Sequence, residues 1–422
     1  MKKQIICGID IGSSKIATIV ALYDEQADEA PKVIGFSSYP SQGIKKGLIV
    51  DIDKATESIE KSVDKAEKMA GYKIEKAFVS VGGPHISSLN SHVLVAITNP
   101  NQEIFENDVE RVVEAARAIS LSSTREIIEV VPCDFTVDGQ GGIKNPVGMT
   151  GVRLEVDTHI ITASQTNLKN IDRCLSDLGI DNQGYIFCGL ASAEAVLTET
   201  EKELGVVLVD IGGGKIDLCF YNEGSLSYSS SIPIGGRHIT NDIAVGLRVS
   251  LDSAEKIKIY LSKKLSDYSN KKKAGEINLV ELKLPEDLSD VSVKTLVDEI
   301  IAPRLEEIFK LIFDEIEKSG LVKNIPSGLV ITGGGSLTAG IIEISKKVIG
   351  LPVRIGIPGR VSGLIDEISN PVYATTIGLI LSGQKKMEKE GSELKSFSQI
   401  WHNFSGGFSF SRLKSFLKQF IP

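Results

Sequence analysis

The stretch Ile9-Asp10-Ile11-Gly12-Ser13-Ser14-Lys15-Ile16 lies near the start of the chain, and Val209-Asp210-Ile211-Gly212-Gly213-Gly214-Lys215-Ile216 repeats it about two hundred residues later. Each stretch lies between apolar runs, which predicts a β-hairpin made of strand, tight turn and strand. Gly and Ser at the tip leave backbone N–H groups uncovered, so such a tip can approach phosphate oxygens closely. One copy would fit an ordinary hairpin, whereas two copies indicate duplicated halves around one nucleotide.

An aspartate ends the first strand of each predicted hairpin. Asp10 and Asp210 would face a polyphosphate, where their charge is tolerated only beside a cation. We therefore predict Mg²⁺ held by these two carboxylates, partly through water. The candidate phosphate-binding residues are Asp10, Gly12, Ser13, Ser14 and Lys15 in the first hairpin and Asp210, Gly212, Gly213, Gly214 and Lys215 in the second.

Composition predicts a soluble globular protein with more than one domain. A chain of 422 residues is too long for one compact core. Its hydrophobic content of 42% and charged content of 24% are ordinary for a soluble globular protein. The net charge of −8 argues against a nucleic-acid partner, which would need a basic face. The five cysteines form no CxxC pair and the five histidines show no metal-ligand spacing, so we expect reduced thiols and no transition-metal site. Asp10 interrupts the apolar start too early for a signal peptide, and we expect a cytoplasmic protein without a membrane span.

Strand and helix patterns divide the chain into two halves with insertions. Residues 1–83 predict three strands, a helix at 53–70 and a further strand, an order that resembles a ribonuclease-H-like half. Within the next stretch, 139–155 is predicted to be a loop and 158–164 a strand. The predicted units are the first half at 1–83, resuming at about 161–200 and 365–384; an inserted subdomain at 84–160; the second half at 201–240, resuming at about 300–364; a helical subdomain at 241–299; a flexible linker at 385–407; and an amphipathic helix at 408–422.

A third glycine cluster, Thr332 to Ser336, follows an apolar strand and precedes a helix. In a protein of two halves it would reach adenosine from the second half, which makes Gly333, Gly334, Gly335 and Ser336 candidates. Between the second hairpin and this cluster, Glu255 and Lys258 are three residues apart and share a helical face. They would contact the ribose and the adenine edge, or form a surface ion pair that contributes less than ~1 kcal/mol.

These three motifs match, in order, the phosphate-1, phosphate-2 and adenosine motifs of the actin/Hsp70/sugar-kinase superfamily. Within it, the chain resembles the FtsA family of bacterial cell-division proteins over essentially its whole length. The stretches that carry this resemblance are Pro132-Cys133-Asp134-Phe135, Asn145–Glu155, Ile234–Ala244 and Asn370–Leu379. The resemblance implies an α/β, actin-like two-domain fold of duplicated halves, with ATP in the cleft between them and an inserted subdomain at 84–160.

The resemblance also implies a function. FtsA-like proteins are ATP-binding scaffolds that self-associate and tether the tubulin-like GTPase FtsZ to the inner face of the membrane at the division site, beside other division proteins. Lys294 and Arg304 match the region that grips the C-terminal peptide of FtsZ, although both would also fit ordinary surface charges. Hydrolysing relatives place a Glu or Gln near the first connecting helix, where Cys188 to Ala193 offers none and Glu194 comes later. We therefore predict no catalytic residue and at most slow ATP turnover.

The end of the chain predicts an in-plane membrane helix. Apolar residues there follow helical spacing, basic residues lie around them, and no acidic residue occurs from Phe397 to Pro422. Docking of this helix on the protein's own body is the alternative. FtsA-like proteins share such a tail. The predicted membrane residues are Arg412, Leu413, Lys414, Phe416, Leu417, Lys418, Phe420 and Ile421.

Two other functions compete with the scaffold. A sugar-type kinase of the same superfamily would need an Asp base in the cleft and would turn over ATP rapidly. A pilus-assembly relative would have a similar insert but no basic tail. The insert and the tail together favour the scaffold.

Overall fold

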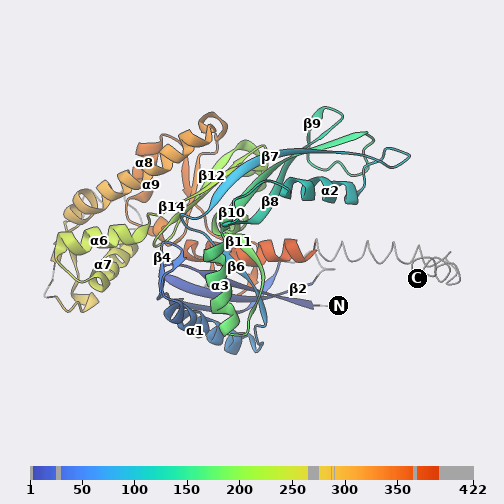
Figure 1. Cartoon of the computed structure of the whole chain (residues 1–422). Coiled ribbons are helices and arrows are strands. Elements are labelled where there is room, and N and C mark those ends of the chain that lie inside the picture. Colours follow the sequence, from blue (N-terminus) through green and yellow to red (C-terminus); the bar gives the residue numbers. More distant parts are fainter. Residues whose placement is uncertain are drawn as a thin grey trace.

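The computed structural model of the chain describes residues 3–24, 30–264, 275–286, 288, 290–364 and 368–388. Figure 1 shows two α/β halves and a third, smaller unit that extends away from both. The predicted α/β class with two similar halves is confirmed, because each half is built around one of the two repeated sequence motifs.

The first half is a six-stranded sheet centred on the first hairpin. Strands β1 (Lys3–Ile11) and β2 (Lys15–Asp24) pair antiparallel, and β6 (Lys76–Val81) joins β1 in parallel. Helix α1 (Ile52–Ala70) begins at Asp51, whose side chain accepts a hydrogen bond from the Lys54 N–H, and ends at a left-handed Gly71. The sheet is completed by β3 (Lys32–Pro40), β11 (Asp181–Phe187) and β19 (Ser362–Gly363), in the order β11-β6-β1-β2-β3-β19.

The second half repeats this plan with five strands. Strands β12 (Val206–Ile211) and β13 (Ile216–Asn222) form the antiparallel hairpin, and β17 (Leu329–Thr332) joins β12 in parallel, as β6 joins β1. Every residue of β12 is buried, which explains the apolar run that precedes Asp210. The order is β14-β13-β12-β17-β18; the other elements are β14 (Ser225–Ile232), β18 (Val353–Ile355), α6 (Gly236–Leu247), α7 (Leu251–Lys264), α8 (Ala302–Ser319) and α9 (Ile341–Ile349).

Two helices join the halves. Helix α4 (Cys188–Val196) packs against β6 and β11 of the first sheet and against β12 and β13 of the second. The second is the helical segment 374–388, which follows a 3-10 turn at Pro371–Tyr373 and lies at the centre of Figure 1, in red. The two helices come closest at Gly378, where a Cβ atom would lie 1.8 Å from the Ala191 carbonyl oxygen. A side chain at this position would therefore force the helices apart.

The third unit is a four-stranded sheet with one helix. Its order is β7-β10-β8-β9, and α2 packs on it over a small core that includes Ile104, Val112 and Phe135. In Figure 1 this teal unit extends away from both halves. Its elements are β7 (Ser87–Ala96), α2 (Glu106–Arg117), β8 (Arg125–Val137), β9 (Gln140–Ile143) and β10 (Arg153–Ser164).

The structure corrects three local predictions. The stretch 139–155, predicted to be a loop, contains the edge strand β9, whose glycines hide any strand periodicity. Strand β10, predicted over 158–164, begins at Arg153. The segment 241–300, predicted to be helical, also contains the short strands β15 (Glu276–Asn278) and β16 (Asp290–Ser292), which are too brief to show an alternating pattern.

Several other short elements were not predicted. The two-residue strands β4 (Ile44–Lys45) and β5 (Leu48–Ile49) form a small hairpin, and a π-helix leads directly into α8. The remaining elements are α3 (Gln165–Asp177), α5 (Glu199–Leu204), the π-helix Thr295–Ile301 and 3-10 turns at Val280–Leu282, Val322–Asn324 and Gly334–Leu337.

The third unit joins the second half through polar contacts on the edge strand β14. Gly83 N donates to Ser231 Oγ at 3.1 Å, and Ser225 Oγ donates to the Cys133 carbonyl at 2.5 Å. His159 of β10 lies between them, with its ring nitrogens 2.7 Å from Asn90 Oδ1 and 2.8 Å from Ser229 Oγ. The interface therefore depends on hydrogen bonds around a buried histidine.

This histidine predicts an acid-sensitive stability. Burial lowers the pKa of His159 from 6.5 to about 4, so the unfolded chain binds the proton more readily than the folded one. The free energy of unfolding should fall as pH falls from 6.5 to 4, by up to about 3 kcal/mol from this group. Urea titrations should show a smaller loss over this window in His159→Gln. The control His92→Gln, at an exposed histidine whose pKa is raised by Asp157, should keep the full acid loss. Equal losses in wild type and His159→Gln would contradict this assignment.

No helix in the described parts of the chain is both long and apolar enough to cross a bilayer. The predicted linker beyond residue 388 and the predicted membrane residues Arg412 to Ile421 lie outside the described residues.

Candidate nucleotide site

The tips of the two repeated hairpins meet each other. A Cβ atom at Gly213 would lie 1.8 Å from Ser14 Oγ, and one at Gly214 would lie 3.0 Å from Ser13 Oγ. Ser13 Oγ in turn accepts a hydrogen bond of 2.9 Å from Gly47 N in the β4–β5 hairpin. The second tip therefore needs glycine because the first tip occupies the space that side chains would take.

Asp10 lies at the end of β1 in a network of hydroxyl and ammonium donors. It is 5% exposed. Ser80 Oγ donates to its Oδ1 at 2.9 Å, while Lys15 Nζ and Thr376 Oγ1 approach its Oδ2 at 3.3 Å each. The Lys15 ammonium also lies 5.4 Å from the ring centre of Tyr373. These contacts hold Lys15 beside the first tip.

Asp210 occupies the equivalent place in the second half. It is also 5% exposed, and its Oδ2 accepts from Ser192 Oγ at 2.5 Å and from Thr375 Oγ1 at 2.9 Å. Thr375 and Thr376 are consecutive residues of the helical segment 374–388, so one turn of that helix contacts both aspartates. The two carboxylates are thereby held by one helical turn, and the region around them and the two hairpin tips is called the crevice below.

The electrostatics of this crevice favour a cation. Burial, and then the negative charge of Asp217, raise the pKa of Asp210, while the Ser192 hydroxyl, the charge of Lys215 and the Thr375 hydroxyl oppose the shift. A carboxylate in this position gains most from a divalent ion with oxygen ligands. The donor set of Asp10 and Asp210 therefore fits Mg²⁺ bound partly through water.

The third glycine cluster packs directly against the second hairpin. Gly333 has a left-handed φ of +79°, and a Cβ atom there would lie 2.2 Å from Asp210 Oδ1. A Cβ at Gly335 would lie 2.2 Å from Ile211 Cγ2, and Ser336 Oγ closes the turn by donating to the Gly333 carbonyl at 2.7 Å. Gly334, at the start of the 3-10 turn, has Val372 as its neighbour. The cluster is a tight backbone turn beside Asp210.

Lys258 reaches the same place from α7. A Cβ atom at Gly236 would lie 3.7 Å from both Lys258 Nζ and the Gly212 carbonyl, and 3.9 Å from Gly335 Cα. Lys258 Nζ bonds Glu255 Oε2 at 2.7 Å and Thr240 Oγ1 at 2.8 Å. The Lys258 side chain is 13% exposed and that of Glu255 43%, so the lysine lies within the cluster and the glutamate at its rim.

The structure thus brings together the sequence-predicted residues of both hairpins, the glycine cluster and the Glu255–Lys258 pair. Lys294 and Arg304 lie apart from them. Lys294 is exposed, whereas Arg304 pairs with both oxygens of Asp242, at 2.6 and 2.9 Å. The sequence did not predict the hydroxyl groups that contact the site residues. Their signal in the sequence is a Ser or Thr inside an otherwise apolar helix or strand. These residues are Ser80, Ser192, Thr240, Thr375 and Thr376.

The first turn of α4 offers no strong base. Burial raises the pKa of the Cys188 thiol to about 12, which keeps it neutral. Glu194 is held by three cations: Lys385 at 2.7 Å, Arg360 at 3.3 Å and Lys202 at 3.6 Å. On a helix Glu194 points away from Ser192, the residue that contacts Asp210. The carboxylate of Glu194 is therefore committed to ion pairs outside the crevice.

Comparison with known proteins shows the family to which the chain belongs. The chain is 39% identical over 383 residues to cell division protein FtsA of Pseudomonas aeruginosa, which covers 91% of this chain and 90% of that protein. The chain belongs to the FtsA family. It is also 33% identical to FtsA of Escherichia coli strain K12, over 92% of this chain and 94% of that protein. Residues 83–162 match the family model for the SHS2 domain inserted in FtsA, and residues 207–378 match the model for cell division protein FtsA.

Solved structures with the same fold are more distant in sequence. A PilM–PilN type IV pilus biogenesis complex aligns with a TM-score of 0.61 at 15% identity, over 90% of this chain and 98% of that one. MreB5 of Spiroplasma citri bound to ADP aligns with a TM-score of 0.54 at 13% identity, over 92% of this FtsA-family chain and 98% of that one. These likenesses confirm the predicted actin-like fold.

Proposed function

We propose that the protein is an actin-like, ATP-binding cell-division scaffold. In this proposal Mg²⁺ and the phosphates of ATP lie against the two hairpin tips and the two aspartates, and the adenosine lies beside the glycine cluster and Lys258. The single observation that carries it is the contact of consecutive Thr376 and Thr375 with Asp10 and Asp210, which brings both carboxylates to one helical turn. The solved MreB5 structures bound to ADP and to AMPPNP support a nucleotide in an actin-like fold of this kind.

Each group of residues has a physical role in this site. The backbone N–H groups of both tips would surround phosphate oxygens, and the ammonium groups of Lys15 and Lys215 would offset their charge. Bound Mg²⁺ would supply charge neutralisation between the phosphates and the two aspartates. Helix α4 presents only the neutral thiol of Cys188 and the carboxylate of Glu194, which is held in ion pairs. ATP hydrolysis should therefore be slow, and ATP would act mainly as a ligand that favours assembly.

Family membership and the sequence of the tail support a proposal for the cellular role. We propose that the chain self-associates and tethers FtsZ, gripped by its C-terminal peptide, to the inner face of the membrane at the division site, together with other division proteins. Lys294 is exposed and can contact an acidic peptide, whereas Arg304 would have to share its guanidinium with Asp242. The basic, apolar-striped tail from Arg412 to Ile421 would lie in the membrane surface and attach reversibly, and joining many tails in a polymer would multiply the attachment.

Vesicle co-sedimentation tests the tether. With ATP, Mg²⁺ and vesicles containing anionic lipid, the full-length chain should sediment with the vesicles and bring FtsZ with it. A chain ending at Gly407 should lose at least about 10-fold in lipid binding, because each cation near an anionic leaflet contributes about 1 kcal/mol. The truncated chain should still bind ATP. Undiminished lipid binding after truncation would contradict the tail assignment, and rapid phosphate release to a small acceptor would favour a kinase instead.

A further inference from the structure

Asp217 lies on β13, two residues beyond the lysine of the second hairpin. Lys215 immediately precedes β13, and its ammonium reaches Asp217 because side chains two apart in an extended chain point the same way. Lys215 Nζ pairs with Asp217 Oδ2, and the two side chains are 9% and 2% exposed. The other carboxylate oxygen, Asp217 Oδ1, is buried and has no hydrogen-bond partner among the described residues. A buried carboxylate oxygen without a donor indicates a place for a bound group.

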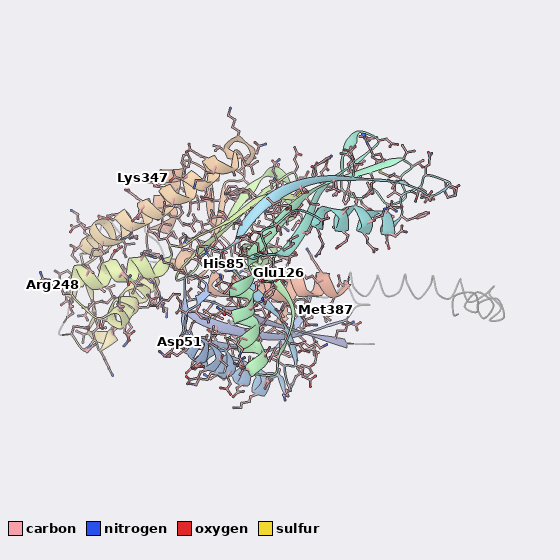
Figure 2. All side chains as sticks on the ribbon, viewed as in Figure 1. Asp51, His85, Glu126, Arg248, Lys347 and Met387 are labelled. Carbon is pink, nitrogen blue, oxygen red and sulfur yellow. The ribbon has the colours of Figure 1, made fainter. Side chains whose placement is uncertain are left out.

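The surroundings of this oxygen are polar. A Cβ atom at Gly82, just after β6, would lie 3.0 Å from Asp217 Oδ1, 2.3 Å from Lys215 Nζ and 3.1 Å from Cys188 Sγ. Burial and then the charge of Lys215 lower the pKa of nearby His85 to about 4, and both of its buried ring nitrogens also lack partners within the described part of the chain. Figure 2 shows His85 near the centre of the molecule, where the three units approach one another. Asp217 Oδ1 and the two ring nitrogens of His85 are therefore three buried polar atoms near the charge of Lys215 that have no hydrogen-bond partner among the described residues.

The other acidic groups near the crevice are already engaged. Both oxygens of Asp10 accept hydrogen bonds, from Ser80 and from Lys15 and Thr376. Asp210 accepts from two hydroxyls, and its other oxygen lies against Gly333. Among the described residues, Asp217 is therefore the carboxylate just beyond the second hairpin tip that has a buried oxygen without a hydrogen-bond donor.

We propose that Asp217 is a catalytic residue, which orients a water molecule against the terminal phosphate of ATP while Lys215 positions its carboxylate. This inference rests on the proposed function. The water O–H donates to Asp217 Oδ1, and the water oxygen attacks the terminal phosphorus. The bond from that phosphorus to the bridging oxygen breaks, and its electron pair leaves with ADP. The water proton passes to Asp217 and then to solvent, so the products are ADP, inorganic phosphate and one proton.

The test compares full-length wild type, Asp217→Asn and the control Asp172→Asn with Mg²⁺. Asp172 is a part-buried aspartate on α3 that accepts from Tyr185 at 2.5 Å and from Asn182 at 3.0 Å. Single-turnover phosphate release should fall about 100-fold in Asp217→Asn and stay unchanged in the control. Affinity for the non-hydrolysable analogue AMPPNP should change by less than about threefold in both variants. Aluminium fluoride should tighten ADP binding in wild type and in the control, and not in Asp217→Asn.

Three results would overturn the inference while leaving the proposed function intact. The first is a wild type that binds AMPPNP but releases no phosphate above background. The second is a release rate in Asp217→Asn within about threefold of wild type. The third is a loss of AMPPNP affinity as large as the loss of rate, which would make Asp217 a structural residue. Failure of wild type to bind AMPPNP at all would overturn the proposed function together with the inference.

Discussion

Replacing Gly378 by Ala is expected to lower the free energy of unfolding by about 3 kcal/mol, although alanine is intrinsically the better helix former by about 1 kcal/mol. The reason is the close crossing of the two helices that join the halves. The new Cβ atom would lie 1.8 Å from the Ala191 carbonyl oxygen and 2.2 Å from its carbon. These are backbone atoms in the interior of α4, so they cannot rotate out of the way. The helices would have to separate, and the contacts that both make with Asp210 would be strained.

Urea denaturation of Gly378→Ala and of the control Gly359→Ala measures this effect. A Cβ atom added at Gly359 would meet no atom of the described residues within 4 Å, and Gly359 has no left-handed φ, so the same substitution there should change stability by less than about 0.5 kcal/mol. Nucleotide affinity should fall in Gly378→Ala even where the protein remains folded, because Ser192 and Thr375 move with the helices. If Gly378→Ala were as stable as wild type, the two helices would have to lie farther apart at Gly378 and Ala191 than the structure shows.

Replacing Asp210 by Asn is expected to weaken Mg²⁺-nucleotide binding by about 100-fold without destabilising the protein. The asparagine oxygen can still accept from Ser192 and Thr375, so the fold keeps these contacts. Burial raises the pKa of Asp210, which means that its charge is a cost to the protein without ligand. Removing the charge should therefore leave the free energy of unfolding equal or higher while removing the attraction for the cation.

Isothermal titration with and without Mg²⁺ measures this second effect. The expected signature is that wild type binds ATP more tightly with Mg²⁺ and that Asp210→Asn loses this difference. The control Asp172→Asn, outside the crevice, should behave as wild type. A large loss of stability in Asp210→Asn, with affinity and stability falling together, would assign Asp210 to folding instead of to the nucleotide.

The repeated hairpins could be predicted from sequence because their signal is local. Apolar runs on both sides of a Gly/Ser tip specify strand, turn and strand, and the second copy specifies the duplicated halves. Helix α1 was predicted to within a residue at each end because it has a stripe of buried residues, an aspartate at its start and a glycine at its end. The glycine cluster was predictable for the same reason.

The rest of the site depends on contacts between distant residues. Thr375 and Asp210 are far apart in the chain, and nothing in the local sequence shows that one helical turn contacts both aspartates. The Asp217 oxygen that lacks a partner among the described residues becomes visible only when its neighbours from β6 and α4 are in place. Short strands such as β15 were missed because three residues cannot show a period of two.

The central claim is that Asp10 and Asp210 act on one nucleotide, and a double-mutant cycle of Mg²⁺-ATP binding tests it most directly. Wild type should bind one ATP per chain, and Asp10→Asn and Asp210→Asn should each weaken binding by about 100-fold. The double variant should be weakened much less than the product of the two single effects, because both carboxylates contact the same ion. Full additivity, or unchanged affinity in either single variant, would contradict the claim.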